Sequence, residues 1–402
     1  MEKVFIVAAK RTPIGAFGGS LKNTSAGNLA AVAIKGALEA AKLAGDKIDE
    51  VIVGNVVGAG QGMGVGRQAA LFAGIPESVP AYGVNMVCGS GMKTVMDAVS
   101  HIRSGDTEIV VAAGVEVMSQ IPFAAPSSIR DGNKMGNLEL KDLLVADGLT
   151  DVYNQYHMGV TAENVAKEIG LTRQQQDEYA LSSQQKAVAA IEAGKFKDEI
   201  VPVEVKQRRE TVLFDTDEYP KANATMEALS KLRPAFDREG TVTAGNASGI
   251  NDGASAIIVA SESAVKAHGL TPIAEIVSYA QSGLDPKIMG LGPVESVNKA
   301  LAKAELTVYD IDVYELNEAF AAQALGVIHQ LAETNQVPVN AIQDKANFNG
   351  GAIALGHPLG ASGNRILVTL VHELHKQNGQ YGVASLCVGG GMGTAVVIKA
   401  VK

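Results

Sequence analysis

Apolar residues follow two different spacings along this chain. Between residues 29 and 45 they recur every three or four positions, which predicts a helix with one buried face. Residues 48–55 then hold a short apolar run that predicts a buried strand. The same order returns later, as a helical pattern over 294–306 and a strand-like run over 310–317. Two distant parts of the chain therefore share one pattern.

A second pair of segments repeats in the same way. "CGSGMKTVMDAVSHIRSG" (88–105) predicts a turn, a helix and a closing glycine, and the strand-like "EIVVAAGVEVMS" follows it. The later counterpart is "GASGNRILVTLVHELHKQNG" (360–379), followed by "YGVASLCVGGGMG". We interpret these repeats as the duplication of one βαβ-type half-domain. Because helix and strand alternate, the pattern predicts parallel sheets.

The region between the two halves has a different composition. Long polar segments dominate residues 120–250, which is too long a stretch for a simple connection inside a compact domain. We predict an inserted loop domain there, a first half of residues 1–119 with 251–270, and a second half of residues 271–402. The basic stretches "QRR" and "KLRPAFDR" are candidates for a positive patch, although ordinary solvated charge fits them equally well.

The composition narrows the class of protein. The 402 residues carry a formal net charge of −9, which argues against nucleic-acid binding, and 44 glycines with 4% aromatic residues are typical of an α/β enzyme. No apolar run approaches the ~20 residues of a membrane span, and the N-terminal run indicates a buried strand rather than a signal peptide. Two distant cysteines fit a reducing compartment. We therefore expect a cytoplasmic enzyme.

Cys88 is the first candidate for chemistry. It stands in "NMVCGSGM", where an apolar lead-in meets glycines and the predicted start of a helix. Free N–H groups at a helix N-terminus lower a thiol pKa, so this position favours a nucleophilic thiolate. The Cys88 N–H would also point at a developing oxyanion. A buried structural cysteine is the alternative that this stretch alone leaves open.

Three further residues stand at comparable positions. His357 precedes a proline, which holds it outside any helix and suits a fixed imidazole that exchanges protons. Cys387 follows the strand-like "VASL" and precedes a run of glycines. Asn317 occupies the strand end that mirrors residue 55 in the repeat, where an amide could orient a water.

Two other patterns carry less weight. His372 and His375 form H-x-x-H on a predicted helix, but no ligand set at zinc-like spacing accompanies them, so we expect a solvated helix face and no metal site. "GNVVGAGQGMGVG" does not match a dinucleotide-binding fingerprint cleanly and indicates a glycine-rich loop.

Four motifs together resemble the thiolase family. "NMVCGSGM", "NEAFAAQA", "NGGAIALGHPLGASG" and "CVGGGMG" stand in the order and spacing of that family, and the likeness covers essentially the whole chain. "YHMGVTAENVA" and "KLRPAFDREGTVTAGNASGINDGA" are similar to the thiolase loop domain. The resemblance implies an α/β fold with duplicated βαβ halves in a five-layer α-β-α-β-α core. With His157 and Met158, it favours the short-chain, biosynthetic branch.

The resemblance also implies roles for single residues. Cys88 would take an acetyl group as a thioester, activated by His357, and Cys387 would remove a proton from the methyl group of a second acetyl-CoA. The carbanion would attack acetyl-Cys88 and give acetoacetyl-CoA. Asn317, through a water, and His357 would form one oxyanion hole. The N–H groups of Cys88 and Gly389 would form the other.

Binding residues follow from the same likeness. Lys221 matches a nucleotide-facing position where an arginine is frequent, and lysine keeps the charge but lacks the planar face that stacks on adenine. Ser248 resembles the serine that hydrogen-bonds pantetheine. The residues that would line the pantetheine tunnel and the acetyl pocket are Leu149, His157, Met158, Met289, Ala319 and Phe320.

The implied partners are coenzyme A thioesters and copies of the same chain. Acetyl-CoA, acetoacetyl-CoA and CoA act as substrates, no cofactor is needed, and no nucleic acid or membrane is expected. The family implies a homotetramer, a dimer of dimers, with a contact near "PFAAPSSIRDGNKMGN". The alternatives are a degradative 3-ketoacyl-CoA thiolase of broader chain length, a β-ketoacyl synthase and a lipid-binding protein without turnover.

Overall fold

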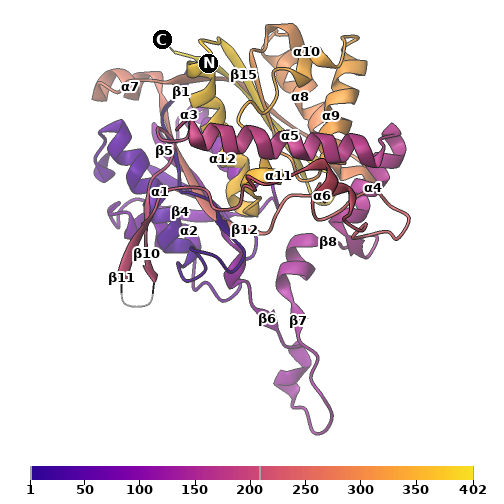
Figure 1. The fold of residues 1–402 in the computed structure, drawn as a ribbon. Helices are drawn as coiled ribbons and strands as arrows, with labels where there is room; N and C mark the ends of the chain where they lie inside the picture. Colours follow the sequence, from indigo (N-terminus) through magenta and orange to yellow (C-terminus); the bar gives the residue numbers. More distant parts are fainter. Residues whose placement is uncertain (1, 208–209, 402) are drawn as a thin grey trace.

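A ten-stranded sheet forms the centre of the molecule (Figure 1). The computed structural model describes residues 2–207 and 210–401. Nine strands follow one another across the sheet, and a short tenth strand, β2 (Gly15–Ala16), pairs with β12. In spatial order the nine are β14 (Val313–Leu316), β15 (Tyr381–Val388), β16 (Met392–Ala400), β13 (Ala274–Gly283), β1 (Val4–Arg11), β12 (Asn251–Ser261), β5 (Ile109–Val117), β3 (Glu50–Gly54) and β4 (Ala81–Val84).

The strand directions correct the prediction of parallel sheets. β3 runs parallel to β4 and β5, and β14 runs parallel to β15, but every other neighbouring pair on the path is antiparallel. Two connections explain the difference. The chain enters β12 from the inserted region, and it enters β16 through the glycines at 389–391, so both strands run back against their neighbours. The alternation of helix and strand correctly predicted the relative direction of only the outer strands of each half.

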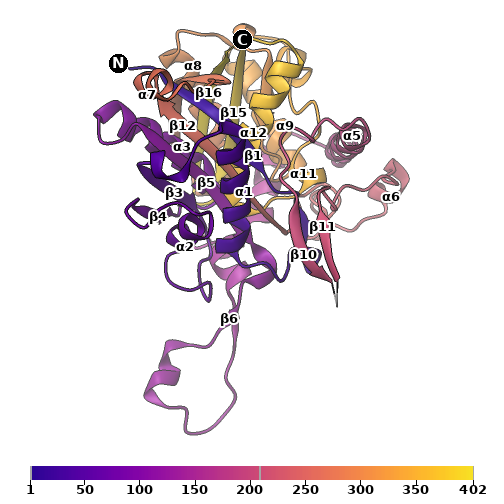
Figure 2. The same ribbon diagram turned by 90° about the vertical axis from the view of Figure 1, so that its left-hand side faces the viewer.

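Helices on both outer sides of the sheet and between its two halves form layers (Figures 1 and 2). One outer layer packs on the first half of the sheet, a middle pair lies between the two halves, and the other outer layer packs on the second half. These layers are α1 (Ala26–Ala41) with α2 (Val65–Phe72), α3 (Ser90–Ser104) with α12 (Leu359–Lys376), and α8 (Gly292–Lys303) with α9 (Ala321–Thr334). The five-layer α-β-α-β-α core expected from the sequence is confirmed. α12 is buried on nearly all sides because sheet strands flank it on both faces.

Glycines bring the two middle helices into backbone contact. A Cβ atom on Gly91 of α3 would lie 2.7 Å from the carbonyl oxygen of Gly360, and a Cβ on Gly363 of α12 would lie 2.6 Å from the amide nitrogen of Met92. Neither backbone atom can turn aside as a flexible side chain could. The first turns of α3 and α12 therefore approach more closely than any residue with a side chain would permit.

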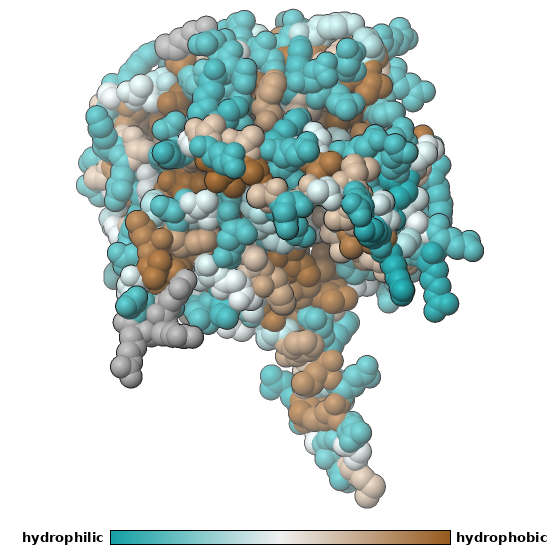
Figure 3. All heavy atoms as spheres, in the orientation of Figure 1, coloured by the Kyte–Doolittle hydropathy of each residue, from teal (hydrophilic) through white to brown (hydrophobic). Residues whose placement is uncertain are grey.

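The inserted region carries three helices, a hairpin and a long arm. The elements are α4 (Met158–Ile169), α5 (Arg173–Glu192), α6 (Met226–Ser230), β10 (Val203–Gln207) with β11 (Glu210–Phe214), and the short pairs β6 (Phe123–Ala124) with β7 (Lys141–Asp142) and β8 (Thr150–Asp151) with β9 (Tyr156–His157). The arm between β6 and β7 projects from the body and exposes apolar side chains, among them Phe123 (63%) and Met135 (92%) (Figures 1 and 3). Beyond the insertion, the remaining helices are α7 (Glu262–His268), α10 (Asn340–Gln343) and α11 (Ala352–Leu355).

A buried ion pair fastens this insertion to the core. Arg11, the last residue of β1, is fully buried and donates to Glu199 at 2.6 Å and to both carboxylate oxygens of Asp217 at 2.7 and 2.9 Å. Such a bidentate pair fixes geometry as well as supplying attraction. The two segments of the insertion that flank the β10–β11 hairpin are thereby held in a defined position against the sheet.

The contact between α3 and α12 gives a prediction on stability. We expect Gly91→Ala to lower the free energy of unfolding by about 1–3 kcal/mol, because the new methyl group overpacks a site lined by backbone. Helix propensity alone would raise stability by up to about 1 kcal/mol. Gly283→Ala is the matched control, since its Cβ would meet nothing closer than 3.9 Å. Thermal denaturation that leaves Gly91→Ala as stable as wild type would contradict this account.

Candidate active site

Four chemistry-bearing side chains converge from loops and strand ends of both halves. They are Cys88 before α3, Asn317 after β14, His357 before α12, and Cys387 near the end of β15. The Cys88 side chain packs against an apolar cluster that includes Leu359, two residues beyond His357. A Cβ on Gly89 would lie 2.9 Å from the side chain of Val388, the neighbour of Cys387. The backbone N–H of Asn317 donates to the backbone carbonyl of Ser385 at 3.0 Å, which places Asn317 beside the end of β15.

The backbone before Cys88 is strained. Val87 has a φ of +46°, a left-handed conformation that a β-branched residue rarely adopts and that costs on the order of 1–3 kcal/mol. Hydrogen bonds hold it there: the Val87 N–H donates to Asn85 at 2.9 Å, and the Ser90 hydroxyl donates to the Val87 carbonyl at 2.6 Å. Strain of this kind is characteristic of functional sites, and here it sets the direction of Cys88.

The electrostatics of Cys88 correct the prediction made from its helix position. Burial raises the pKa of the Cys88 thiol to about 11, while N–H groups of Gly389 and of Cys88 itself donate toward the sulfur and lower it. The nearby Glu116 carboxylate raises the pKa further. The expected lowering is therefore wrong, because the loss of water outweighs the helix start. Cys88 is a neutral thiol at neutral pH.

Ser362 determines which nitrogen of His357 carries the proton. The Ser362 hydroxyl lies 2.9 Å from the carbonyl of Pro358, which can only accept, and 2.6 Å from His357 Nδ1. The hydroxyl hydrogen therefore goes to Pro358, and Nδ1–H donates to Ser362. Nε2 is left as the acceptor. Burial, with a smaller effect from the charge of Arg365, lowers the pKa of His357 to about 4, so the imidazole is neutral.

Cys387 and Asn317 are buried on the opposite side of the site. Burial raises the pKa of Cys387 far above the usual range for a thiol, and the adjacent Cys88 raises it further. Within residues 2–207 and 210–401, neither side-chain atom of Asn317 has a hydrogen-bond partner, and His357 Nε2 has none either. Buried polar atoms are normally paired, so these three are suited to a substrate oxygen or a water.

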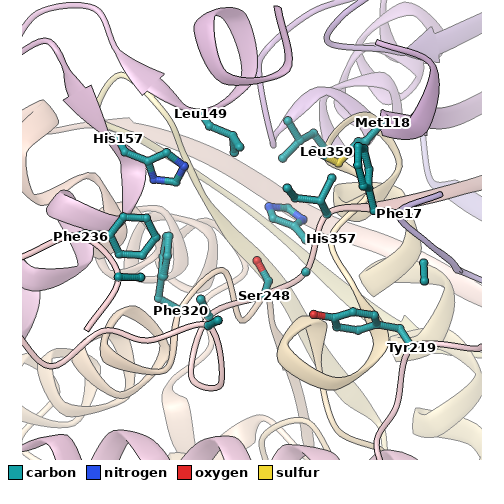
Figure 4. A pocket seen from close by; sticks show the side chains of 16 residues that line it. Phe17, Met118, Leu149, His157, Tyr219, Phe236, Ser248, Phe320, His357 and Leu359 are labelled. Carbon is teal, nitrogen blue, oxygen red and sulfur yellow. The ribbon is translucent and has the colours of Figure 1, made fainter. Parts of the chain in front are cut away.

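A cavity of about 470 Å³ opens beside His357 (Figure 4). Its lining is mostly apolar, and besides His357 it contains four of the binding residues expected from the sequence: Leu149, His157, Ser248 and Phe320. A cavity of this size and character is suited to an extended organic ligand. Further lining side chains had no signal in the sequence and became visible only in the fold: Phe17, Met118, Tyr219, Phe236 and Leu359.

The other expected binding residues lie outside that lining. Met158, Met289 and Ala319 pack with Phe320 and Cys387 in one apolar cluster behind the cavity. Gly389 lines a second cavity of about 540 Å³, together with Val87 and Met158.

The positive patch is only partly supported. Lys221 is exposed, with its Nζ 5.6 Å from the ring centroid of Tyr219, a residue of the first cavity. Arg233 and Arg238 are also exposed. The two arginines of "QRR", at 208 and 209, lie outside the described residues.

Other sequence patterns have simple structural explanations. His372 and His375 bring their Nε2 atoms to the carbonyls of Ala9 and Ile273, at 2.9 and 2.7 Å. In the described part of the chain, no group of three or more His, Cys, Asp or Glu side chains is arranged to hold a metal ion. No helix in that part is long and apolar enough to cross a membrane.

Comparison with known proteins agrees with the motifs and the fold. The acetyl-CoA acetyltransferase of Cupriavidus necator is 54% identical over 400 residues, covering 99% of this chain and all of the relative. The crystal structure of human mitochondrial 3-ketoacyl-CoA thiolase superposes with a TM-score of 0.94 at 46% identity, covering 100% and 99% of the two chains. That of the Bacillus anthracis acetyl-CoA acetyltransferase gives 0.95 at 43% identity, with the same coverage.

The family assignment covers both halves. Residues 4–263 match the thiolase N-terminal domain, and residues 270–400 match the thiolase C-terminal domain. The family expected from the four motifs is therefore confirmed, and this chain belongs to the thiolase family.

Proposed function

We propose that this enzyme is an acetyl-CoA C-acetyltransferase, which condenses two acetyl-CoA molecules reversibly to acetoacetyl-CoA and CoA. The observation that carries the proposal is the pairing of two thiols, the half-buried Cys88 and the buried Cys387, with a neutral histidine whose Nε2 is free to accept a proton. The names of the full-length relatives support it. A thioester exchange needs a nucleophile that also leaves well, and a cysteine supplies both.

The first half-reaction is an acyl transfer. Because Cys88 is protonated at rest, it passes its proton to His357 Nε2 as its sulfur attacks the carbonyl of acetyl-CoA. The carbon–sulfur bond to CoA breaks, and the leaving CoA thiolate takes the proton of Cys387. The products are acetyl-Cys88, free CoA, an imidazolium at His357 and a thiolate at Cys387.

The second half-reaction forms the carbon–carbon bond. The Cys387 thiolate removes a proton from the methyl group of a second acetyl-CoA, and the carbanion attacks the carbonyl of acetyl-Cys88. Cys88 leaves as a thiolate and recovers its proton from His357. Every group then returns to its resting protonation state, and thiolysis runs the same steps backwards.

Two sets of donors stabilise the negative oxygens. Asn317, through a water, and His357 would bind the enolate oxygen of the thioester that loses a proton, since their buried side-chain atoms lack other partners. The N–H groups of Cys88 and Gly389 would bind the oxyanion on acetyl-Cys88. Neither set needs a metal ion, and the only small molecules required are the CoA thioesters.

The same proposal extends to CoA binding, the assembly of the chains and the domain division. Pantetheine would lie in the cavity with Ser248 and His157, and Lys221 beside Tyr219 would meet the nucleotide end of CoA. We propose a homotetramer in which the projecting arm buries its exposed apolar side chains against another copy. We also place the enzyme in the cytoplasm. We also propose the domain division stated above: a first half of residues 1–119 with 251–270, a loop domain of residues 120–250 and a second half of residues 271–402.

A degradative 3-ketoacyl-CoA thiolase is the second candidate, because one of the similar structures carries that name. The apolar cluster of Met158, Met289 and Phe320 packs with Cys387, and in this proposal it limits the length of the acyl chain beside the reacting carbon. Thiolysis rates on acetoacetyl-CoA and on 3-ketohexanoyl-CoA distinguish the two. Faster turnover of the longer substrate would favour the degradative enzyme.

Exchanging each cysteine separates the two half-reactions. We expect Cys88→Ser to lose more than about 10³-fold in thiolysis and to gain no acetyl group, because the nucleophile is gone. Cys387→Ser should still be acetylated at Cys88, at a reduced rate, while condensation is lost. Mass spectrometry after incubation with acetyl-CoA detects the added acetyl group. Full activity of Cys88→Ser would exclude the covalent route.

The buried histidine gives a prediction on pH. Since the pKa of His357 is lowered to about 4, acetylation of Cys88 should not fall between pH 8 and 5.5 through protonation of this residue. The unfolded chain binds that proton near pH 6.5, so this histidine's contribution to stability is present above pH 6.5 and is lost as the pH falls toward 4. Quenched-flow acetylation and thermal unfolding across pH 4.5–8 test both effects.

Two variants complete the pH experiment. His357→Asn should remove the dependence of stability on pH that this side chain causes, and it should slow acetylation. The same change at His268, exposed on α7, should leave acetylation unchanged. An acetylation rate in wild type that halves near pH 6.5 would mean that His357 titrates like a solvated histidine.

A further inference from the structure

The two halves of the sheet share a register that relates their residues one to one. Gly54, the last residue of β3, pairs with Gly114 of β5, and Leu316, the last residue of β14, pairs with Ser385 of β15. One residue beyond each first strand stand Asn55 and Asn317. Two residues beyond each partner stand Glu116 and Cys387. Glu116 therefore occupies in the first half the position that Cys387 occupies in the second.

The two middle helices extend this correspondence. "NMVCGSGM" (85–92) before α3 and "HPLGASGN" (357–364) before α12 align through their shared Ser-Gly, at Ser90 and Ser362. Cys88 then corresponds to Gly360, and Asn85 corresponds to His357. The two halves thus form a counterpart of the whole active site, with Asn55, Asn85 and Glu116 from the first half and Gly360 from the second, and none of these residues is a thiol or an imidazole.

Glu116 forms a saturated set of hydrogen bonds in this counterpart. Its carboxylate is 1% exposed, and each oxygen accepts two donors. Oε2 accepts the N–H groups of Val56 at 2.9 Å and Gly360 at 2.9 Å. Oε1 accepts the N–H of Val57 at 3.1 Å and the side-chain amide of Asn55 at 3.1 Å. One carboxylate therefore joins the loop after β3 to the segment that carries His357.

Asn85 continues this connection to the nucleophile. Its side-chain amide donates to the carbonyl of Val56 at 3.0 Å, and its oxygen accepts the N–H of Val87 at 2.9 Å. Val87 is the strained residue directly before Cys88. A continuous path of hydrogen bonds thus runs from the His357 segment through Glu116, Val56 and Asn85 to the backbone of the Cys88 loop.

We propose that Glu116 is a positioning residue that holds the Cys88 loop and the His357 segment in register for acyl transfer. The inference rests on the proposed function for the reaction that it serves. Glu116 belongs to the counterpart site, which holds no thiol or imidazole. The hydrogen bonds of that site fix the loops that carry Cys88 and His357 in the active site. A misplacement of about 1 Å between two reacting groups can cost about 10²-fold in rate.

The charge of Glu116 supports the same role. Burial raises its pKa to about 7, against the opposing effect of its four hydrogen-bond donors. Its carboxylate also raises the pKa of Cys88, which links its position to the nucleophile. Among the described residues, the side chains whose titration is coupled to that of Cys88 are Glu116 from β5 and Cys387 from β15, and Glu116 is the carboxylate of the two.

Glu116→Gln tests the proposal. Glutamine has one acceptor oxygen and one amide group, so either orientation places an NH₂ against two N–H donors and breaks two of the four bonds. We expect kcat for thiolysis of acetoacetyl-CoA to fall about 30-fold or more, with KM within about 3-fold of wild type. The pH at which iodoacetamide labels Cys88 half-maximally should fall, because the negative charge beside the thiol is gone.

Two further variants keep the test decisive. Asp312→Asn is the matched control: its carboxylate also accepts backbone N–H groups, at Gln380 and Tyr381, but at the far end of β15 from Cys387, and kcat should not change. Asn85→Ala breaks the path beyond Glu116 and should lower kcat even where Glu116→Gln does not fold.

Different results would refute the positioning role of Glu116 and the proposed function. A folded Glu116→Gln with kcat and Cys88 labelling like wild type, or an Asn85→Ala with full kcat, would reduce the network to a structural role. A wild-type enzyme that does not cleave acetoacetyl-CoA would instead refute the proposed function, and iodoacetamide labelling would still report on Cys88.

Discussion

The contact between the first turns of α3 and α12 is the constraint on which the rest of the molecule depends. Glycines at 91 and 363 let the two backbones touch, and a third glycine, Gly114 of β5, lets the start of α12 approach that strand. Cys88 and His357 precede those turns. Without that approach the two halves would still form sheets and helices, but their reactive groups would not meet.

Burial then decides the protonation state of each group. The same loss of water that stabilises the five-layer core keeps Cys88 and Cys387 as thiols and His357 as a neutral imidazole. The resting site holds no charge on these three groups. In the proposed mechanism a thiolate and an imidazolium form only during the reaction, at positions from which most water is excluded.

The sequence was informative where chemistry requires a particular residue type. Cys88, Asn317, His357 and Cys387 stand beside glycines and strand ends, and the repeat predicted the two halves. Strand direction was not predictable from alternation, because β12 and β16 return through an insertion and a tight turn. Val87, Ser362 and Glu116 gave no signal: a backbone angle, a tautomer and a shared carboxylate depend on contacts between residues far apart in the chain. The pKa of Cys88 was mispredicted because a local helix start was weighed without the burial that the whole fold imposes.

The register shared by the two halves has an evolutionary consequence. A chain made of two identical halves would place equal residues at the corresponding positions of both halves, and would therefore form two equivalent sites. Once the halves were fused, one site was free to change without loss of the other. A carboxylate at 116 and a glycine at 360 now stand where the thiols of its partner stand. Asymmetry between the copies thus lets one duplicated scaffold hold a reactive site and, at the corresponding position, a fixed network of hydrogen bonds.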